Sequence, residues 1–144
     1  MVPRWVIILF LLIAFLGFLD AAYLTVEHYR GTIPPCSLVE GCERVLTSGY
    51  SIVLGVPVAL FGALYYLMIA GLTFWYLDRG GVNILRIAAW GTIGGLVASL
   101  WFIFVQLFLI HSICLYCMFS AGTSTALFAL GMWILSRTSV LNRA

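Results

Sequence analysis

The amino-acid sequence predicts an all-α integral membrane protein, a four-transmembrane-helix bundle with a polar loop between helices 1 and 2. Hydrophobic residues make up 64% of the 144 residues, and charged residues only 8%. A soluble domain of this length cannot bury so much apolar surface. Four apolar stretches are long enough to cross a hydrocarbon core of about 30 Å. We expect spans at residues 5–26, 56–77, 87–110 and 113–135, within one membrane domain covering residues 1–144.

The first span, residues 5–26, contains a single charged residue, Asp20. A cleaved signal peptide is the competing interpretation, because Arg4 precedes the apolar run. The run is longer than the apolar part of a typical signal peptide, however, and Asp20-Ala21-Ala22 makes a poor cleavage site. We therefore expect a membrane helix here.

The loop of residues 27–55 is the longest polar segment of the chain and contains two of the four cysteines. Pro34-Pro35 is incompatible with a helix before the first of these cysteines. Gly41 loosens the chain before Cys42, and residues 42–54 are long enough for a short surface helix.

The second half of the chain predicts two helical hairpins. Pro57 is expected in the first turn of the second span, where its missing N–H costs nothing. Residues 78–81 form a turn, and only residues 111–112 separate the third span from the fourth. Three glycines of the third span allow close contact between helices: Gly91, Gly94 and Gly95.

The arginines predict the orientation of the bundle. Five lie at one end of the predicted spans and two at the other, and the excess marks the cytoplasmic side: Arg4, Arg79, Arg86, Arg137 and Arg143 against Arg30 and Arg44. Both termini are then cytoplasmic in a multi-pass protein of the cell membrane. The loop of residues 27–55 and the start of the fourth span face outward, so all four cysteines share the oxidising side.

The four cysteines form two pairs, Cys36 with Cys42 and Cys114 with Cys117. Cys114 and Cys117 are three positions apart, which places them on one face of a helix within reach of disulfide formation. With Ser112 as the N-cap, Cys114 falls in the first helical turn. The free N–H groups and the helix dipole there favour the thiolate, which is the reactive form of cysteine.

Two disulfide-capable pairs on one face of a membrane bundle indicate a thiol relay. The pair in the loop, Cys36 and Cys42, can meet a soluble partner. The pair at the start of the fourth span, Cys114 and Cys117, stays beside the lipid, and we call it the helix-mouth pair. Thiol–disulfide exchange would carry two electrons between the pairs, and a quinone is the obvious lipid-soluble acceptor. Two alternatives are a non-catalytic four-helix scaffold with structural disulfides and a four-thiolate zinc site. We expect no metal ion, and the few charges give no support for nucleic-acid binding.

The sequence also resembles the vitamin K epoxide reductase family, in particular its short bacterial and archaeal members. Four stretches carry the resemblance: Leu19 to Thr25 (LDAAYLT), Pro35-Cys36 through Gly41-Cys42 with Val45 and Ser48, Gly55 to Ala59 (GVPVA) with Gly62 and Tyr66, and His111 to Cys117 (HSICLYC) with Ser120-Ala121. Four cysteines in this order and topology make the resemblance specific.

The resemblance implies a four-helix bundle around a quinone of the ubiquinone, menaquinone or vitamin K type. Cys36 would exchange with a thioredoxin-like partner, Cys42 would relay to Cys114, and Cys117 would face the quinone. Ser48 matches a family serine close to the cysteines. Some relatives carry a fused thioredoxin-like domain, which this sequence lacks, so we expect a separate DsbA-like partner protein.

The activity expected from these residues is that of a thiol:quinone oxidoreductase that reoxidises a disulfide-forming partner. Reduction of vitamin K or its epoxide is the alternative within the family. The mammalian enzyme has a tyrosine where this chain has Ala121, which argues against epoxide reduction.

Several other residues are candidates for the quinone site. Asp20 is an acid within a span, which marks a functional candidate by default, although a carboxylate that merely reaches the interface explains it equally well. His111 could hydrogen-bond a quinone oxygen or only the backbone, and a haem held by His28 and His111 is a remote alternative. Gln106 is expected to form a hydrogen bond between helices. Aromatic residues that could wall the ring are Phe61, Tyr65, Trp101 and Phe119.

Overall fold

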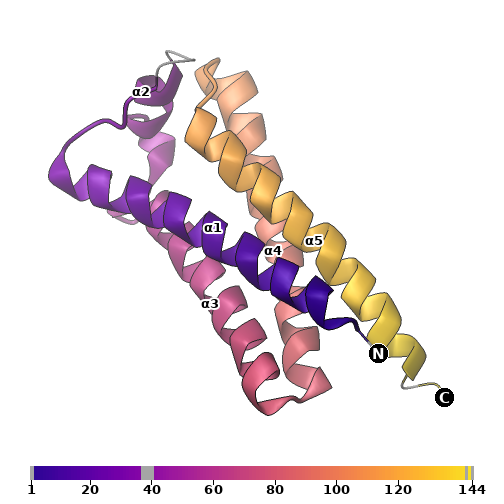
Figure 1. The fold of residues 1–144 in the computed structure, drawn as a ribbon. Helices are drawn as coiled ribbons and strands as arrows, with labels where there is room; N and C mark the ends of the chain where they lie inside the picture. The colour runs from indigo at the N-terminus through magenta and orange to yellow at the C-terminus, as the bar shows by residue number, and fades with distance from the viewer. Residues whose placement is uncertain (1, 37–40, 142, 144) are drawn as a thin grey trace.

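The computed structural model describes residues 2–36, 41–141 and 143, and four long helices dominate it (Figure 1). They are α1 (Arg4–Arg30), α3 (Val58–Arg79), α4 (Val82–Phe104) and α5 (Leu115–Leu141). Four stretches built from these helices are long and apolar enough to span a membrane. The predicted all-α membrane bundle is therefore confirmed, and the chain is a multi-pass membrane protein.

The four helices pack so that α1 and α4 each contact both α3 and α5. Glycines bring the backbones close together. A methyl group on Gly17 of α1 would lie 2.6 Å from ring carbons of Tyr66 on α3, and one on Gly131 of α5 would lie 2.7 Å from Thr92 Oγ1 on α4. In a bilayer the hydrophobic effect does not drive helices together. Small residues at the crossings let the helices pack closely, and this close packing stabilises the bundle.

The three glycines expected to permit close contact behave differently. A methyl group on Gly91 would come within 3.1 Å of Ile69, and Gly95 lies against two side chains that line the pocket described below. Nothing lies within 4 Å of a methyl group on Gly94, so the prediction was wrong for that position.

The outer surface of the bundle is apolar along its length. Large hydrophobic side chains are at least half exposed on every long helix, which is normal for a surface that faces lipid and unusual for one that faces water. Examples are Trp5, Phe15, Phe74, Trp90 and Trp101.

The helices begin and end at different residues from those predicted. The first helix extends four residues beyond Val26 to Arg30, and it is followed by Gly31, whose φ of 70° is left-handed. The third begins at Val82, five residues before the predicted start. Hydropathy marks the part of a helix inside the hydrocarbon, whereas helical hydrogen bonding continues into the polar boundary.

Pro57 precedes the second spanning helix instead of lying in its first turn, so that prediction was wrong by one position. It has ψ of 136° and belongs to β2 (Val56–Pro57), which pairs antiparallel with β1 (Ile52–Val53). Leu54 and Gly55 both have positive φ and form the tight turn of this hairpin.

Two short helices lie in the loop before the hairpin, α2 (Gly41–Leu46) and the 3₁₀ turn η1 (Gly49–Ser51). A short surface helix was expected in this region. The helix exists, but Cys42 and Val45 on it are buried, so it is packed onto the bundle and not merely laid on its surface.

The connection from α4 to α5 contains irregular backbone. After Phe104 the helix continues as a π-helical segment, η2 (Val105–Ile110), and His111 then adopts a left-handed conformation with φ of 56°. Such π-helical turns are rare and frequently occur at functional sites.

The two ends of the bundle carry different features (Figure 1). Both termini and the α3–α4 turn lie at one end, and α2 and the start of α5 lie at the other. The loop cysteines and the helix-mouth cysteines therefore share one end of the molecule.

Candidate redox-active site

The loop cysteines are joined to each other and the helix-mouth cysteines are free. A disulfide links Cys36 to Cys42, with Cα atoms 6.2 Å apart. Residues 37–40 between them are outside the described part of the chain. Cys114 and Cys117 are both free thiols. The pairing of Cys36 with Cys42 that the sequence predicts is thus confirmed.

The loop is held directly over the helix mouth by a close backbone contact at Gly41. A methyl group there would lie 2.8 Å from Ile113 N and closer still to Ile113 O. Only glycine permits this approach. Its neighbour Cys42 then joins Cys114 and Val45 in one buried cluster, with 1% of Cys42 and none of Cys114 exposed.

The start of α5 differs from the predicted cap. The carbonyl of Cys114 accepts the first helical bond, from Met118 N–H at 3.0 Å, so Cys114 is the N-cap and Ser112 is not. The reason lies in η2, where the Gln106 carbonyl accepts bonds from the His111 and Ser112 N–H groups. These bonds keep Ser112 in the connection.

Gln106 forms the hydrogen bond between helices that was expected of it. Its side chain is 2% exposed, and its Oε1 accepts a bond from the Cys114 backbone N–H at 2.9 Å. A side chain from the preceding helix thus fixes the position of Cys114.

The thiol of Cys114 lies just outside the spanning part of α5, and its pKa is lowered below that of an ordinary thiol. The largest cause is a hydrogen bond with the Cys117 side chain; the backbone N–H groups of Tyr116 and Cys117 add to it, and burial opposes it. The lowered pKa favours the thiolate of Cys114, and a sulfur with a low pKa leaves readily when a mixed disulfide is resolved.

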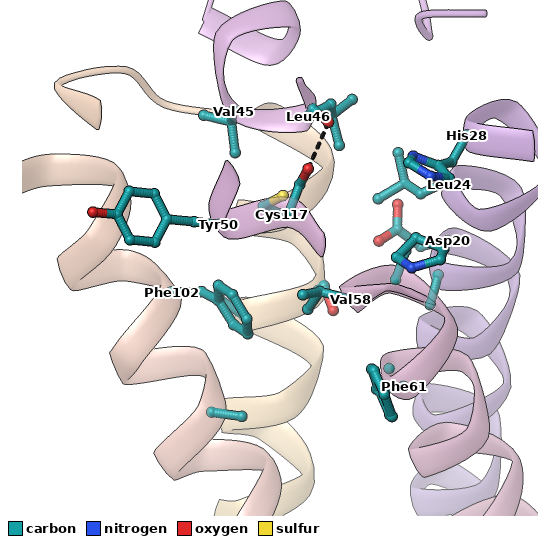
Figure 2. A pocket seen from close by; sticks show the side chains of 18 of the residues that line it. Asp20, Leu24, His28, Val45, Leu46, Tyr50, Val58, Phe61, Phe102 and Cys117 are labelled. Carbon is teal, nitrogen blue, oxygen red and sulfur yellow. Dashed lines mark hydrogen bonds between the residues drawn. The ribbon is translucent and has the colours of Figure 1, made fainter. Parts of the chain in front are cut away.

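A pocket of about 550 Å³ lies beneath the loop, and all four spanning helices contribute to its wall. This volume is within the range of about 300–1,000 Å³ that is usual for small-molecule sites. Cys117 lines the pocket and Cys114 does not. Figure 2 shows Asp20 of α1 across the pocket from Phe102 of α4, with Cys117 between them in that view. The two free thiols thus have different neighbours, the loop disulfide for Cys114 and the pocket for Cys117.

Residues 8–132 of the chain match the profile of the vitamin K epoxide reductase family. The chain belongs to this family. A curated relative, the thiol-disulfide oxidoreductase LTO1 of Arabidopsis thaliana, is 33% identical over 125 residues. The alignment covers 79% of this chain and 32% of LTO1, so the chain spans about a third of the length of that relative.

Among the candidates for supporting roles, four line the pocket of this family member: Asp20, Ser48, Phe61 and Tyr65. Ser48 is partly buried, and its hydroxyl donates to the Val45 carbonyl at 2.7 Å.

Three candidates are not among the residues that line the pocket, so the structure does not bring them together with Cys117 there. His111 is exposed in the connection after η2. Phe119 is 49% exposed, since a residue two positions after Cys117 lies about 200° around the helix. Trp101 is 55% exposed on the outer face of α4.

Three contributions to the site differ from the sequence-based predictions or are absent from them. Gly41 was read as a flexible joint, although its role is a close backbone contact. Phe102 and Ser124 line the pocket and were not singled out. For Ser124 a signal existed, because a residue seven positions after Cys117 returns to the same helix face.

Proposed function

We propose that this chain is a membrane thiol:quinone oxidoreductase that reoxidises a thioredoxin-like, disulfide-forming partner outside the cytoplasm. One observation carries the proposal. Cys114 is buried beside Cys42, while Cys117, on the next turn of the same helix, lines an apolar pocket. A relay needs one sulfur to receive electrons from the loop and another to meet the acceptor, and this arrangement supplies both.

The proposed relay balances in two exchanges and one oxidation. A partner dithiol reduces the Cys36–Cys42 disulfide and leaves oxidised. Cys42 then attacks Cys114 of a Cys114–Cys117 disulfide and releases Cys117, and Cys36 resolves the mixed disulfide by attacking Cys42. The Cys114–Cys117 dithiol finally closes to a disulfide and passes two electrons and two protons to a quinone, which leaves as hydroquinone.

The pairing of the described sulfurs is compatible with this order. The loop pair is oxidised and the helix-mouth pair is reduced. This is the state expected after the internal exchange and before the quinone is reduced, with the loop ready for another partner dithiol.

The pocket fits a quinone ring by size and by the character of its wall. Apolar side chains line most of it, and a few polar groups converge on it. Asp20 contributes a buried oxygen, Oδ2, without a hydrogen-bond partner among the described residues. We assign Phe61 and Tyr65 to the wall around the ring, and Ser48 to the side of the pocket formed by the loop.

The roles of the two helix-mouth sulfurs are tested with Cys114→Ser, which leaves Cys117 unpaired beside the ring. We expect a new visible absorption band when menadione binds, from charge transfer between thiolate and quinone, and loss of the band as the pH is lowered. Cys117→Ser should show no such band and should lose quinone reduction, while Cys42 and Cys114 still exchange.

A band in Cys117→Ser alone would reverse the two roles. If the reduced wild-type protein is not reoxidised by menadione at all, the chain is a scaffold and the proposed activity is wrong.

The proposed orientation, with cytoplasmic termini and outward-facing cysteines, has a separate test. After reduction of intact cells, a membrane-impermeant thiol reagent should label Cys36. Labelling only after the inner side is opened would contradict the orientation and the extracytoplasmic partner.

A further inference from the structure

Two buried hydroxyls on different helices point to a subsite that the relay does not use. Tyr65 Oη on α3 and Ser124 Oγ on α5 are both inaccessible, and neither has a hydrogen-bond partner among the described residues. Ser124 is 1% exposed, and both residues line the pocket. In a bilayer no bulk water can satisfy such groups, so leaving them unpaired costs free energy.

The two hydroxyls meet at a glycine of a third helix. A methyl group built on Gly95 of α4 would collide with the hydroxyl end of Tyr65 and would lie 2.8 Å from Ser124 Oγ. The bare Cα of Gly95 is therefore what allows both polar groups to converge at this point of the wall.

The adjacent tyrosine of α3 shows how a hydroxyl in this bundle is normally satisfied. Tyr66 Oη donates to the Ser120 carbonyl at 2.7 Å and also lies 3.0 Å from Ser120 Oγ and 2.8 Å from Thr123 Oγ1. The bundle thus satisfies one tyrosine of the pair completely and leaves the other open toward the pocket.

The position of this open pair relative to Cys117 suggests its ligand. Ser124 follows Cys117 by seven residues, which places it on the same face of α5 about 10.5 Å further into the bundle. Between them lies Ala121, whose small side chain leaves room in the pocket. A flat ring against Ala121 would have one edge toward the sulfur and the opposite edge toward the hydroxyls.

We propose that Tyr65 and Ser124 bind the quinone oxygen remote from Cys117, and so fix which way round the ring lies. The inference rests on the proposed quinone reductase function. A hydroxyl can donate to a quinone carbonyl and can accept from the hydroquinone hydroxyl. The same two residues therefore suit both forms of a substrate that carries oxygens on opposite sides of its ring.

The test compares Tyr65→Phe, Ser124→Ala and the double variant with Thr125→Ala as the matched control. Thr125 is also on α5, but its side chain is exposed and its hydroxyl is satisfied by the Ala121 carbonyl at 2.8 Å. With menadione as acceptor, we expect each single variant to raise KM about five- to tenfold, the loss typical of one hydrogen bond. The Cys42–Cys114 exchange and the control should be unchanged.

Infrared spectra of bound menadione, labelled at one carbonyl at a time, give a readout that a structural role would not move. One labelled carbonyl should absorb at lower frequency in the wild-type protein, and this shift should disappear in Tyr65→Phe and Ser124→Ala. In the double variant the effects on KM should not add, because both residues address the same oxygen.

The melting temperature of the detergent-solubilised protein without quinone separates the remaining possibilities. Deleting a buried hydroxyl that has no partner removes a cost, so the melting temperature should rise or stay the same. A lower value in both single variants, with KM and carbonyl frequencies unaltered, would overturn the subsite, because the hydroxyls would then be partners of each other. Wild-type protein that reduces menadione while both variants keep its KM and spectrum would also overturn the subsite alone. If the wild type neither binds nor reduces menadione, the proposed function itself fails.

Discussion

The two cysteine pairs lie next to each other in space, but the secondary structure that carries them differs. The loop pair is carried by an extended segment and a helix of six residues. The helix-mouth pair begins a helix of 27 residues, and a buried glutamine holds its first N–H. The comparison teaches that a loop with little regular structure can be positioned over a helix terminus by a close backbone contact, here Gly41 against Ile113.

The largest effect should come from removing the partner-facing sulfur. Cys36→Ala should reduce turnover with a thioredoxin-like partner to background, because no disulfide remains on the loop to be reduced. A small dithiol that reaches the helix-mouth pair directly should still drive quinone reduction, more slowly. Parallel assays with both donors measure this separation. Equal loss with both would show that the two pairs do not have separate roles.

A methyl group at the contact between the two pairs should be the next most damaging change. Gly41→Ala forces the loop away from Ile113, and a displacement of about 1 Å can slow a positioned reaction about 100-fold. Stopped-flow transfer from the loop pair to the helix-mouth pair measures the rate. Gly49→Ala is the control, because nothing lies within 4 Å of a methyl group there. Similar rates in both variants would contradict the role given to Gly41.

The lowered pKa of Cys114 should depend on its neighbour at position 117. In Cys117→Ser the hydroxyl can still donate, so the pKa of Cys114 should stay below that of an ordinary thiol. In Cys117→Ala the pKa of Cys114 should rise, because burial raises this pKa and the hydrogen bond that offsets the burial is lost. As the pH is lowered, the serine variant should therefore keep its Cys114 thiolate to a lower pH than the alanine variant.

Ultraviolet absorbance of the thiolate, followed against pH with the loop disulfide intact, reads Cys114 alone in either variant. Coincident titration curves would show that the hydrogen bond from position 117 is not the cause.

The smallest effect should come from a side-chain hydrogen bond between the start of α5 and the segment that leads to Cys36. The Tyr116 hydroxyl donates to the Pro35 carbonyl at 3.1 Å, and its ring lies 5.8 Å from that of Tyr23. Tyr116→Phe keeps the ring contact and loses an exposed hydrogen bond, so turnover with a protein partner should fall about two- to threefold. Tyr29→Phe, at an exposed position, serves as the comparison. A change in small-dithiol turnover would indicate that Tyr116 acts on the pocket instead.

The membrane bundle and its cysteine end could be predicted because hydropathy and cysteine order are written directly in the sequence. Which helix face meets the pocket could not. A spanning helix is apolar on every side, so Phe119 toward lipid and Phe61 at the pocket have the same signature. A hydrogen bond from the Gln106 side chain was expected, but its partner, the Cys114 N–H, was not. The π-helical turn that orients Gln106 toward Cys114 cannot be recognised from the amino-acid sequence.

The location of all cysteines at one end of the bundle also has an energetic meaning (Figure 1). Moving one elementary charge through a bilayer is worth about 2.3 kcal/mol per 100 mV of transmembrane voltage. In the proposed relay, electrons and protons are taken from a partner and handed to a quinone at the same face. No step carries charge through the membrane, so a cell could run the reaction equally well with its membrane energised or depolarised.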